Sequence, residues 1–436
     1  MKKTILPLLL ILLTLQQLPI NAAVAKVSQE SSYTEGNYTL IIEGYDWGPT
    51  VKKVVIPMAD LVTEVNTSDF TVSVMRSKEG VEMQPAESKG DREVLFAYVS
   101  DETGNRLTEG NHATLVLLVH PNNPLDSPIK YIFKEGRGSN QWIDYSLNIT
   151  HTPTSKVWDT EAGRIYPELD RFDLKGTHTS NGSTLSYGSF EPESISSKTP
   201  LIIWLHGGGE GGTDPSIALI ANKATNYATD EIQTYFGKAY VLVPQTPTFW
   251  MQSESGNYTR GDTDDIYNKA LFNLIESYVA KHPKIDTDRI YIGGCSNGGY
   301  MSLKLILEHP NYFAAGYISA LAYQNKYITD KEIERIKNVP IWFVHSEDDT
   351  TTVPDETVVP LYNRLIAAGS PNVHFSYYEH VVDLTGFYGG KDYYFPGHWS
   401  WIYSHANNAN FDFNQKPVLL NGRVVTIMEW LASQKR

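Results

Sequence analysis

Residues 290–300 read IYIGGCSNGGY, and this stretch decides the fold that we predict for most of the chain. Its first residues are β-branched or aromatic, as in a buried strand, and apolar residues recur at helical spacing from Tyr300 onward. Between the two, Gly294 and Gly298 flank Ser296 in a G-x-S-x-G pattern. A serine at the apex of so sharp a turn has strained backbone angles, and side chains two positions away would collide. The stretch therefore predicts a nucleophile elbow that presents the Ser296 hydroxyl above a sheet.

The acid that would serve this serine is expected in a loop after a later strand. A serine hydroxyl is a poor nucleophile until a base takes its proton, so an elbow requires an acid and then a histidine further along the chain. The apolar run 340–344 is typical of a buried strand, and Glu347, Asp348 and Asp349 follow it. We favour Asp349 as the group that orients the histidine. Asp348 and Glu347 stay open as rivals, and the plain alternative is an acidic surface loop in which Asp349 caps the next helix.

Four histidines follow the acid loop, and one of them has the setting of a general base. His398 comes directly after a proline and a glycine, in a loop that can lay its side chain over the sheet edge. We therefore favour His398 as the base. His380 and His405 remain alternatives, whereas His374 alternates within a strand pattern and is expected to be structural.

An oxyanion hole needs two backbone donors, and the sequence offers both. The residue after the nucleophile, Asn297, should supply one N–H group. The other should come from residues 206–212, HGGGEGG, which follow a continuous apolar run and form what we term the glycine loop. Glycines let the backbone approach a substrate and turn its N–H groups inward, so Gly208 is favoured and Gly207 is the alternative. His206 is expected to tie the loop down.

Aromatic side chains are frequent near the expected site and predict part of a substrate pocket. Trp399 follows the favoured histidine directly, Gln245 ends a predicted strand, and Trp250 lies shortly after that strand. We expect these three residues to line the pocket. Their chemistry suits an apolar acyl or aryl site or a platform for a sugar, and core packing is the alternative for the tryptophans.

The chain falls into four parts. Residues 1–25 combine two early lysines, an apolar run and an Ala-Val-Ala cleavage site, as a secretory signal peptide does. Residues 28–150 carry short β-type runs separated by turn residues, which predicts an all-β sandwich of immunoglobulin-like size. Residues 151–168 are polar and mixed, and we expect a linker there. From 169 to 436 strands alternate with helices, which predicts a mainly parallel, doubly wound sheet.

Charge and cysteine content exclude several classes of protein. There are 36 lysines and arginines against 50 acidic residues, a net charge of −14 without a basic cluster, so a nucleic-acid partner is not expected. Cys295 is the one cysteine, so an intrachain disulfide is ruled out, and we expect its side chain to be buried. The acidic residues 262–265 suit a helix cap better than a calcium site, and neither a metal nor a cofactor is expected. The signal peptide predicts a secreted protein, extracellular or periplasmic.

Together these motifs resemble the α/β-hydrolase superfamily, and more narrowly secreted bacterial esterases with an N-terminal immunoglobulin-like domain. The resemblance covers nearly the whole mature chain, and its carriers are EGYDWG at 43–48, LHGGGEGG at 205–212, VPQ at 243–245, GCSNGG at 294–299, residues 345–354 and GHWSW at 397–401. It implies a triad of Ser296, Asp349 and His398 and esterase activity on small acyl esters, and it allows homo-oligomers to form through the first domain. Ser346 stands where related acid loops have a glycine, which keeps Asp348 open beside Asp349.

The sequence thus predicts a secreted serine carboxylesterase whose substrate is a small-molecule or polysaccharide-linked ester. The nearest alternative is a peptidase of the prolyl-oligopeptidase type, which usually carries a propeller or another cap, and the sequence has no blade repeats. The alternative from another class is a non-catalytic surface or glycan-binding protein on a hydrolase scaffold. Covalent labelling of Ser296 distinguishes the enzyme from the binding protein.

Overall fold

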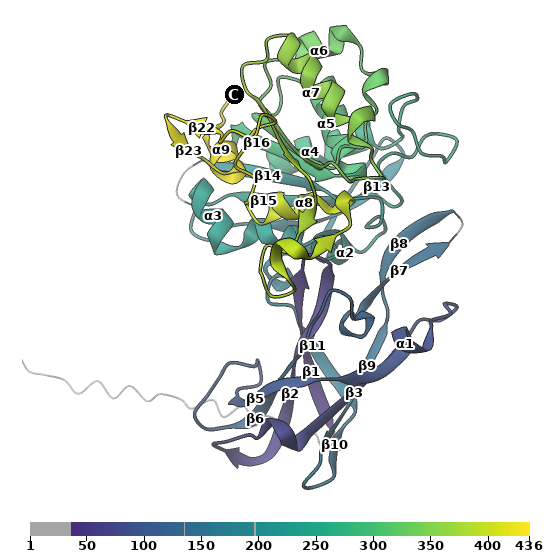
Figure 1. Ribbon diagram of the computed structural model, residues 1–436, viewed down its shortest axis with the longest axis vertical. Helices are drawn as coiled ribbons and strands as arrows, with labels where there is room; N and C mark the ends of the chain where they lie inside the picture. Colours follow the sequence, from purple (N-terminus) through teal and green to yellow (C-terminus); the bar gives the residue numbers. More distant parts are fainter. Residues whose placement is uncertain (1–35, 135, 196–197) are drawn as a thin grey trace, which may run out of the picture.

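The structure is a computed structural model that describes residues 36–134, 136–195 and 198–436. The predicted signal peptide, residues 1–25, lies outside the described residues. Figure 1 shows two bodies stacked along the long axis, a purple and blue β-domain and a teal to yellow α/β domain. Within the described part, no helix combines the length and the apolar character needed to cross a membrane.

The N-terminal domain is a sandwich of two sheets with one projecting hairpin. Five strands pair in the order β11-β1-β2-β6-β5 and four in the order β10-β9-β3-β4, while β7 and β8 pair with each other. The elements are β1 (Asn37–Tyr45), β2 (Gly48–Val62), β3 (Phe70–Ser77), α1 (Pro85–Ser88), β4 (Lys89–Arg92), β5 (Val94–Ser100), β6 (Gly110–Leu117), β7 (Ile129–Lys134), β8 (Arg137–Trp142), β9 (Asp144–His151), β10 (Lys156–Trp158) and β11 (Thr160–Ile165).

Alternating side chains build the core between these two sheets. In β3, Phe70, Val72 and Val74 are buried while the residues between them are more exposed, and Leu147 and Ile149 are buried on the paired strand β9. This period of two is what a strand with one buried face requires. The short runs predicted from the sequence form strands β1, β2, β3, β5, β6 and β9, and the predicted sandwich is confirmed.

The predicted linker at 151–168 is wrong, because much of this segment completes the sandwich. β10 pairs antiparallel with β9, and β11 pairs parallel with β1. Trp158 is fully buried, and its indole N–H donates to the Pro57 carbonyl at 3.1 Å. Both strands lie at sheet edges, so many of their side chains face solvent, and this polarity is what resembled a linker.

Replacing Trp158 with alanine is expected to destabilise the N-terminal domain by about 3–5 kcal/mol, because a large buried side chain is lost and a cavity remains. The matched control is Val157→Ala, at a neighbouring side chain that is 37% exposed, with an expected change below about 1 kcal/mol. Urea unfolding followed by circular dichroism measures both variants. Equally small effects would mean that this segment contributes nothing to the sandwich.

The α/β domain contains one eight-stranded sheet in the order β12-β13-β15-β14-β16-β17-β18-β19. From β15 to β19 in this order all neighbours run parallel, whereas β12 and β13 pair antiparallel. The predicted mainly parallel sheet is therefore confirmed. The strands are β12 (Asp173–Ser180), β13 (Ser183–Phe190), β14 (Thr199–Leu205), β15 (Tyr240–Gln245), β16 (Ile285–Cys295), β17 (Ala315–Ser319), β18 (Ile341–Ser346) and β19 (Val373–Tyr378).

Helices and short strand pairs surround this sheet. The helices are α2 (Pro215–Ile220), α3 (Asp230–Phe236), α4 (Asn268–Lys281), α5 (Asn297–Glu308), α6 (Asp330–Ile336), α7 (Val358–Ala367), α8 (Trp401–His405) and α9 (Ile427–Ser433). The two-residue strands β20 (Val381–Val382) and β21 (Tyr394–Phe395) pair with each other, as do β22 (Leu419–Leu420) and β23 (Arg423–Val424).

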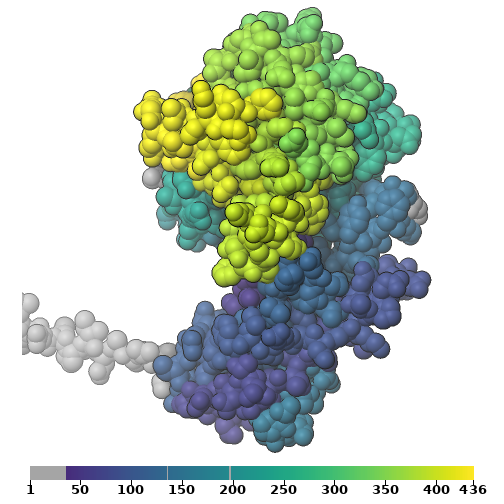
Figure 2. All heavy atoms as spheres, viewed as in Figure 1, coloured from purple at the N-terminus to yellow at the C-terminus, as the bar shows by residue number. Residues whose placement is uncertain are grey.

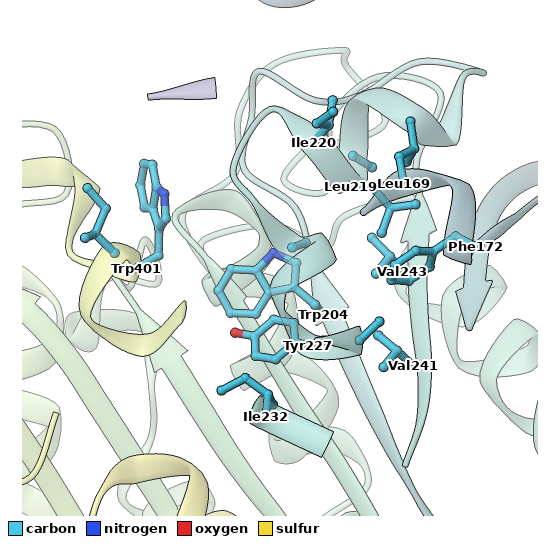
Figure 3. Close-up of a cluster of buried hydrophobic side chains, with 14 of the residues drawn as sticks. Leu169, Phe172, Trp204, Leu219, Ile220, Tyr227, Ile232, Val241, Val243 and Trp401 are labelled. Atoms are coloured by element: carbon cyan, nitrogen blue, oxygen red, sulfur yellow. The ribbon is translucent and has the colours of Figure 1, made fainter. Parts of the chain in front are cut away.

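Each face of the sheet is covered by a hydrophobic layer. On one face Trp204 packs against Tyr227, with ring centroids 5.5 Å apart, and Figure 3 shows them beside Val241 and Val243 of β15. Trp204 is fully buried, and the other residues of β14 are buried as well. A strand buried on both faces reads as a continuous apolar run, which is why the sequence predicted it.

The topology of the sheet decides where a site can lie. The strand β15 lies on one side of β14, and β16 lies on the other. In open α/β sheets, ligands bind outside the carboxyl ends of the strands where the winding reverses. Leu205 at the end of β14 pairs with Gly294 near the end of β16. The glycine loop and Ser296 therefore leave the sheet side by side.

Candidate active site

Ser296 occupies a strained turn between the end of β16 and the start of α5. Its backbone has φ 55° and ψ −113°, a conformation that persists in a residue with a side chain only where the surroundings impose it. A Cβ at Gly298 would lie 1.9 Å from the Leu205 carbonyl oxygen, and a Cβ at Gly294 would lie 2.6 Å from the backbone of Gly298. Both glycines are thus required by close packing, as expected for an elbow. Cys295 beside the serine is fully buried.

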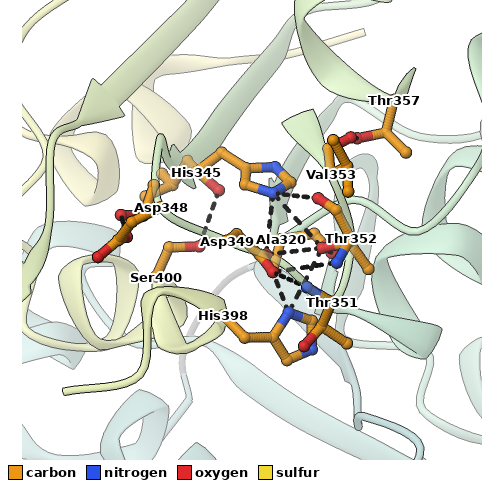
Figure 4. A network of polar contacts seen from close by, with 12 residues as sticks. Ala320, His345, Asp348, Asp349, Thr351, Thr352, Val353, Thr357, His398 and Ser400 are labelled. Carbon is orange, nitrogen blue, oxygen red and sulfur yellow. Dashed lines mark hydrogen bonds and ion pairs between the residues drawn. The ribbon is translucent and has the colours of Figure 1, made fainter. Parts of the chain in front are cut away.

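Asp349 is buried and contacts the ring of His398. Its Oδ2 lies 2.9 Å from His398 Nδ1 and 3.0 Å from His345 Nε2, and the Thr352 hydroxyl donates to the same oxygen at 2.7 Å. The backbone N–H groups of Thr351 and Thr352 donate to Oδ1 at 2.8 and 3.0 Å. Figure 4 shows the two imidazoles on opposite sides of the carboxylate. Burial alone would raise the pKa of Asp349, but the hydrogen bonds from His345 and His398 hold it well below its ordinary range, so Asp349 stays ionised.

The rival acid and a rival histidine form a separate pair at the surface. Asp348 Oδ2 lies 2.9 Å from His380 Nδ1, and this contact raises the pKa of His380. Glu347 is exposed. His405 is buried against Trp204, and burial lowers its pKa to about 3, which keeps the ring neutral. The cavity that contains Ser296 is lined by none of these four rivals.

His345 is a partner of Asp349 to which the sequence analysis gave no role. It is fully buried in β18, and its Nε2 also lies 2.9 Å from the Thr352 carbonyl oxygen. Because both neighbours of Nε2 are acceptors, this nitrogen carries the proton. A histidine inside an apolar strand gives no separate signal in the sequence. His374, which we expected to be structural, lies in β19. Its Nδ1 is 2.9 Å from Asp412 Oδ2.

The glycine loop is fixed by His206, as the sequence predicted. The ring Nδ1 lies 2.6 Å from the Gly207 carbonyl oxygen, and Nε2 accepts the Thr246 N–H at 3.3 Å. Burial lowers the pKa of His206 to about 4, so the ring is neutral and Nδ1 donates. In a planar trans peptide the C=O and the following N–H point in opposite directions. The Gly208 N–H therefore points away from His206, and Asn297 adds the N–H of the first residue of α5, which has no acceptor within its own helix.

One cavity of about 760 Å³ brings the predicted residues together. Its lining includes Ser296 and His398, and also Trp399, which we expected to line the pocket. The predicted oxyanion donors line it as well, namely Gly207, Gly208 and Asn297.

The expected pocket roles of Gln245 and Trp250 are wrong. Gln245 is buried at the end of β15, where its amide donates to the Glu210 carbonyl at 2.8 Å and accepts the Ser186 hydroxyl at 3.0 Å. Trp250 is fully buried and packs on His206, with ring centroids 5.1 Å apart. Both residues contact the glycine loop rather than the cavity. The chain after β15 first runs against that loop, where the Gly212 N–H donates to the Thr246 carbonyl at 2.8 Å, and reaches the cavity at Met251.

The N-terminal domain forms one wall of this cavity. Tyr131 and Asn140 reach it from the β7–β8 hairpin, and Trp47 reaches it from the turn between β1 and β2. Figure 1 shows the hairpin rising from the sandwich toward the α/β domain, and in Figure 2 the yellow-green part of that domain rests on the blue N-terminal domain. No sequence pattern marks this domain as part of the site, since side chains that meet across a domain interface leave no local pattern.

Glu210 is a buried carboxyl at this interface. The Asn140 side-chain amide donates to its Oε1 at 2.8 Å. With its nitrogen turned toward the carboxyl, the Asn222 amide donates to both oxygens, at 3.0 and 3.2 Å. Burial raises the pKa of Glu210 to about 7, and hydrogen bonds from Asn140 and the Gly207 backbone offset only part of this rise. Glu210 therefore changes its charge near neutral pH.

Among the acidic residues 262–265, Asp265 contacts the start of α4. Asp265 Oδ1 accepts the N–H groups of Tyr267 and Asn268 at 3.1 and 2.8 Å, at the start of α4. Across residues 36–134, 136–195 and 198–436, no group of three His, Cys, Asp or Glu side chains is arranged to hold a metal ion.

Two family models match the chain. Residues 37–165 match the esterase Ig-like N-terminal domain, and residues 192–385 match the phospholipase/carboxylesterase family. The chain thus joins an esterase-type immunoglobulin-like domain to an α/β-hydrolase domain that matches the phospholipase/carboxylesterase family. The second match ends before His398, so the place of that histidine in the esterase rests on the geometry described above.

One solved structure and one curated protein are similar to this chain. The crystal structure of a thermostable esterase superposes with a TM-score of 0.71 over 92% of this chain and 99% of that chain, at 23% identity, which shows a shared fold. Feruloyl esterase B of Neurospora crassa is 27% identical over 137 residues, which are 31% of this chain and 44% of the relative. The match thus spans less than half the length of that curated relative.

Glu210→Gln is expected to remove a pH dependence from the stability of the esterase. A folded-state pKa of about 7, above the ordinary 4.5, means that the folded state loses stability as the pH rises through this range. The loss amounts to about 3 kcal/mol once Glu210 is fully ionised. The glutamine side chain cannot ionise, so the stability of the variant relative to wild type should increase by up to that amount between about pH 5 and about pH 8.

Urea unfolding of both chains at the two pH values measures this difference. Glu356→Gln is the matched control, because Glu356 is an exposed carboxyl that accepts the Gln324 amide at 2.9 Å. No comparable increase is expected for it. If the difference in the free energy of unfolding between Glu210→Gln and wild type were the same at both pH values, Glu210 would keep one charge state across this pH range.

Proposed function

We propose that this carboxylesterase works by covalent catalysis at Ser296, with His398 as the base and Asp349 as the residue that orients the base. The proposal is carried by the 2.9 Å contact of His398 Nδ1 with Asp349, in a cavity lined by both His398 and Ser296. A neutral histidine that donates through Nδ1 presents Nε2 as an acceptor. Nε2 is therefore free to take a proton from the serine.

The reaction follows in two steps. Ser296 Oγ attacks the ester carbonyl carbon while His398 Nε2 takes the hydroxyl proton, and the buried carboxylate of Asp349 stabilises the resulting imidazolium. The tetrahedral intermediate then breaks its bond to the alcohol oxygen, which leaves with the proton from His398. Water attacks the acyl-enzyme in the same way, with His398 again as base, and releases the acid and the free serine.

The oxyanion of each tetrahedral intermediate is assigned to two backbone donors. Asn297 supplies the N–H after the nucleophile, and Gly208 supplies the N–H that points away from His206, with Gly207 as the alternative. Support for Gly208 comes from the 2.6 Å contact between His206 Nδ1 and the Gly207 carbonyl oxygen. This contact fixes the orientation of the peptide bond between Gly207 and Gly208. Such preorganised donors act without reorganisation when charge develops.

The substrates proposed are esters of small acyl or aryl acids, including esters carried by carbohydrate. A cavity of about 760 Å³ is of the size that holds small ligands. Tyr131, Trp47 and Trp399 give it aromatic surfaces, while Gln324 gives it a hydrogen-bonding group. The similarity to a feruloyl esterase over part of the chain supports an aryl ester in particular.

Secretion is part of the same proposal. Residues 1–25 carry the basic start, the apolar run and the small-residue cleavage site of a signal peptide. An ester on a polysaccharide is too large to enter a cell, so an enzyme acting on it has to meet it outside.

Two neighbouring aspartates provide a direct test of the triad. Asp349→Asn is expected to lower kcat by roughly a thousandfold or more, because the amide cannot stabilise the imidazolium. Asp348→Asn, one residue away, should change kcat less than about threefold, because Asp348 pairs with His380 outside the cavity. Hydrolysis of p-nitrophenyl esters of increasing acyl length measures both variants beside Ser296→Ala, which should be inactive.

Three results would contradict the proposal. Turnover by Ser296→Ala would mean that Ser296 is not the nucleophile. A larger loss of kcat in Asp348→Asn than in Asp349→Asn would mean that Asp348, not Asp349, orients the base. Faster cleavage of the matching p-nitroanilides than of the esters would favour the peptidase alternative over the ester substrate.

A further inference from the structure

The β7–β8 hairpin of the N-terminal domain contacts the glycine loop through backbone and side chain. The Asn140 N–H donates to the Gly209 carbonyl at 2.7 Å, and the Asn140 side-chain amide donates to Glu210 at 2.8 Å. One residue of the hairpin therefore holds two consecutive residues of the loop. Nearby, the Trp142 indole N–H donates to the Ser216 hydroxyl at 2.9 Å, which fixes the hairpin on the start of α2.

The hairpin fits tightly against Gly209 of the loop, so that a side chain there would require its neighbours to shift. A Cβ at Gly209 would lie 3.0 Å from Tyr131 Cε2 and 3.4 Å from Asn140 Nδ2. Tyr131 itself comes from the hairpin and lines the cavity. The hairpin thus packs directly against the backbone of the segment that carries the proposed oxyanion donor, one residue from Gly208.

Glu210 is anchored from several sides. Its carbonyl accepts the Gln245 amide at 2.8 Å, its N–H lies 3.4 Å from the Gly207 carbonyl oxygen, and its carboxyl meets Asn140 and Asn222. The Gly207 carbonyl is the same one that His206 holds. Glu210 therefore connects two parts of the molecule, since its N–H contacts the Gly207 carbonyl of the peptide that orients Gly208 and its carboxyl accepts from Asn140 of the other domain. Glycine backbones have wide conformational freedom, so this segment depends on such outside contacts for a single geometry.

We propose that Glu210 and Asn140 are positioning residues, and that their contact across the domain interface holds the glycine loop in the geometry that the oxyanion requires. The inference rests on the proposed function, because it takes the Gly208 N–H as an oxyanion donor. It makes the N-terminal domain act on the chemical step through the hydrogen bond between the Asn140 and Glu210 side chains, in addition to forming a wall of the cavity. Neither residue touches the reacting atoms in this account.

Steady-state kinetics with p-nitrophenyl acetate test the proposal on the full chain. Asn140→Ala is expected to lower kcat about tenfold, less than the loss of a whole oxyanion donor, while KM changes less than about twofold. Glu210→Gln keeps an oxygen that accepts from Asn140 and should retain kcat within about threefold. Glu210→Ala should lose as much as Asn140→Ala or more.

The double variant shows whether the two residues act through each other. If Asn140 acts through Glu210, Asn140→Ala adds less than about twofold to the effect of Glu210→Ala, because the contact is already absent. If the losses of kcat in the two single variants multiply fully in the double variant, Asn140 contacts the substrate on its own. This result would overturn the proposal. Should Glu210→Ala fail to fold, the same cycle is run with Glu210→Leu, whose side chain fills similar space but cannot accept from Asn140, so Asn140→Ala should again add less than about twofold.

Asn122→Ala is the matched control, since Asn122 accepts the Tyr393 hydroxyl at 2.9 Å across the same two domains but does not line the cavity. Its kcat should stay within about twofold of wild type. Wild-type kcat in Asn140→Ala, or an equal loss in Asn122→Ala, would overturn the proposal while leaving Ser296→Ala inactive. Failure of the proposed function looks different, because turnover would then persist in Ser296→Ala whatever the result at Asn140.

Discussion

Close packing of backbone around Ser296 is the constraint on which the rest of the site depends. The serine holds φ 55° and ψ −113°, and a Cβ at Gly298 would lie 1.9 Å from the Leu205 carbonyl oxygen. Leu205 is the last residue of β14, so the turn that carries Ser296 is pressed against the strand that leads into the glycine loop. Nucleophile and oxyanion donors are thus placed by close packing between the start of α5 and the end of β14. The strain at Ser296 is balanced by the buried strand and helix on either side of it.

A second set of contacts decides which charged groups serve that serine. Oδ2 of Asp349 accepts hydrogen bonds from His398 Nδ1, His345 Nε2 and the Thr352 hydroxyl, all within 3.0 Å. These hydrogen bonds keep the buried carboxylate ionised. Asp348 points the other way and pairs with His380 at the surface. Neighbours in the sequence therefore have different functions, because one side chain enters the core and the next one leaves it.

The sequence predicted those features that are fixed by contacts within a few residues. The elbow, the parallel sheet and the short strands of the sandwich follow from spacing and from residue types, and the His398 loop follows from its position after the acid loop. The linker prediction for 151–168 failed because edge strands such as β11 are as polar as a linker. Gln245 and Trp250 contact the glycine loop instead of lining the cavity, and their places at the end of β15 and shortly after it do not show which way their side chains point. Tyr131 and Asn140 could not be found, because their place in the site depends on how two domains dock.

The central claim is that Ser296 is the nucleophile and that Gly208 and Asn297 receive the oxyanion. A crystal structure of the full chain after reaction with a fluorophosphonate tests this claim most directly, since the phosphoryl oxygen occupies the place of the oxyanion. The account predicts phosphorus bonded to Ser296 Oγ, with that oxygen about 2.7–3.1 Å from the backbone nitrogens of Gly208 and Asn297. A phosphonate on another residue, or a phosphoryl oxygen turned away from the glycine loop, would contradict it.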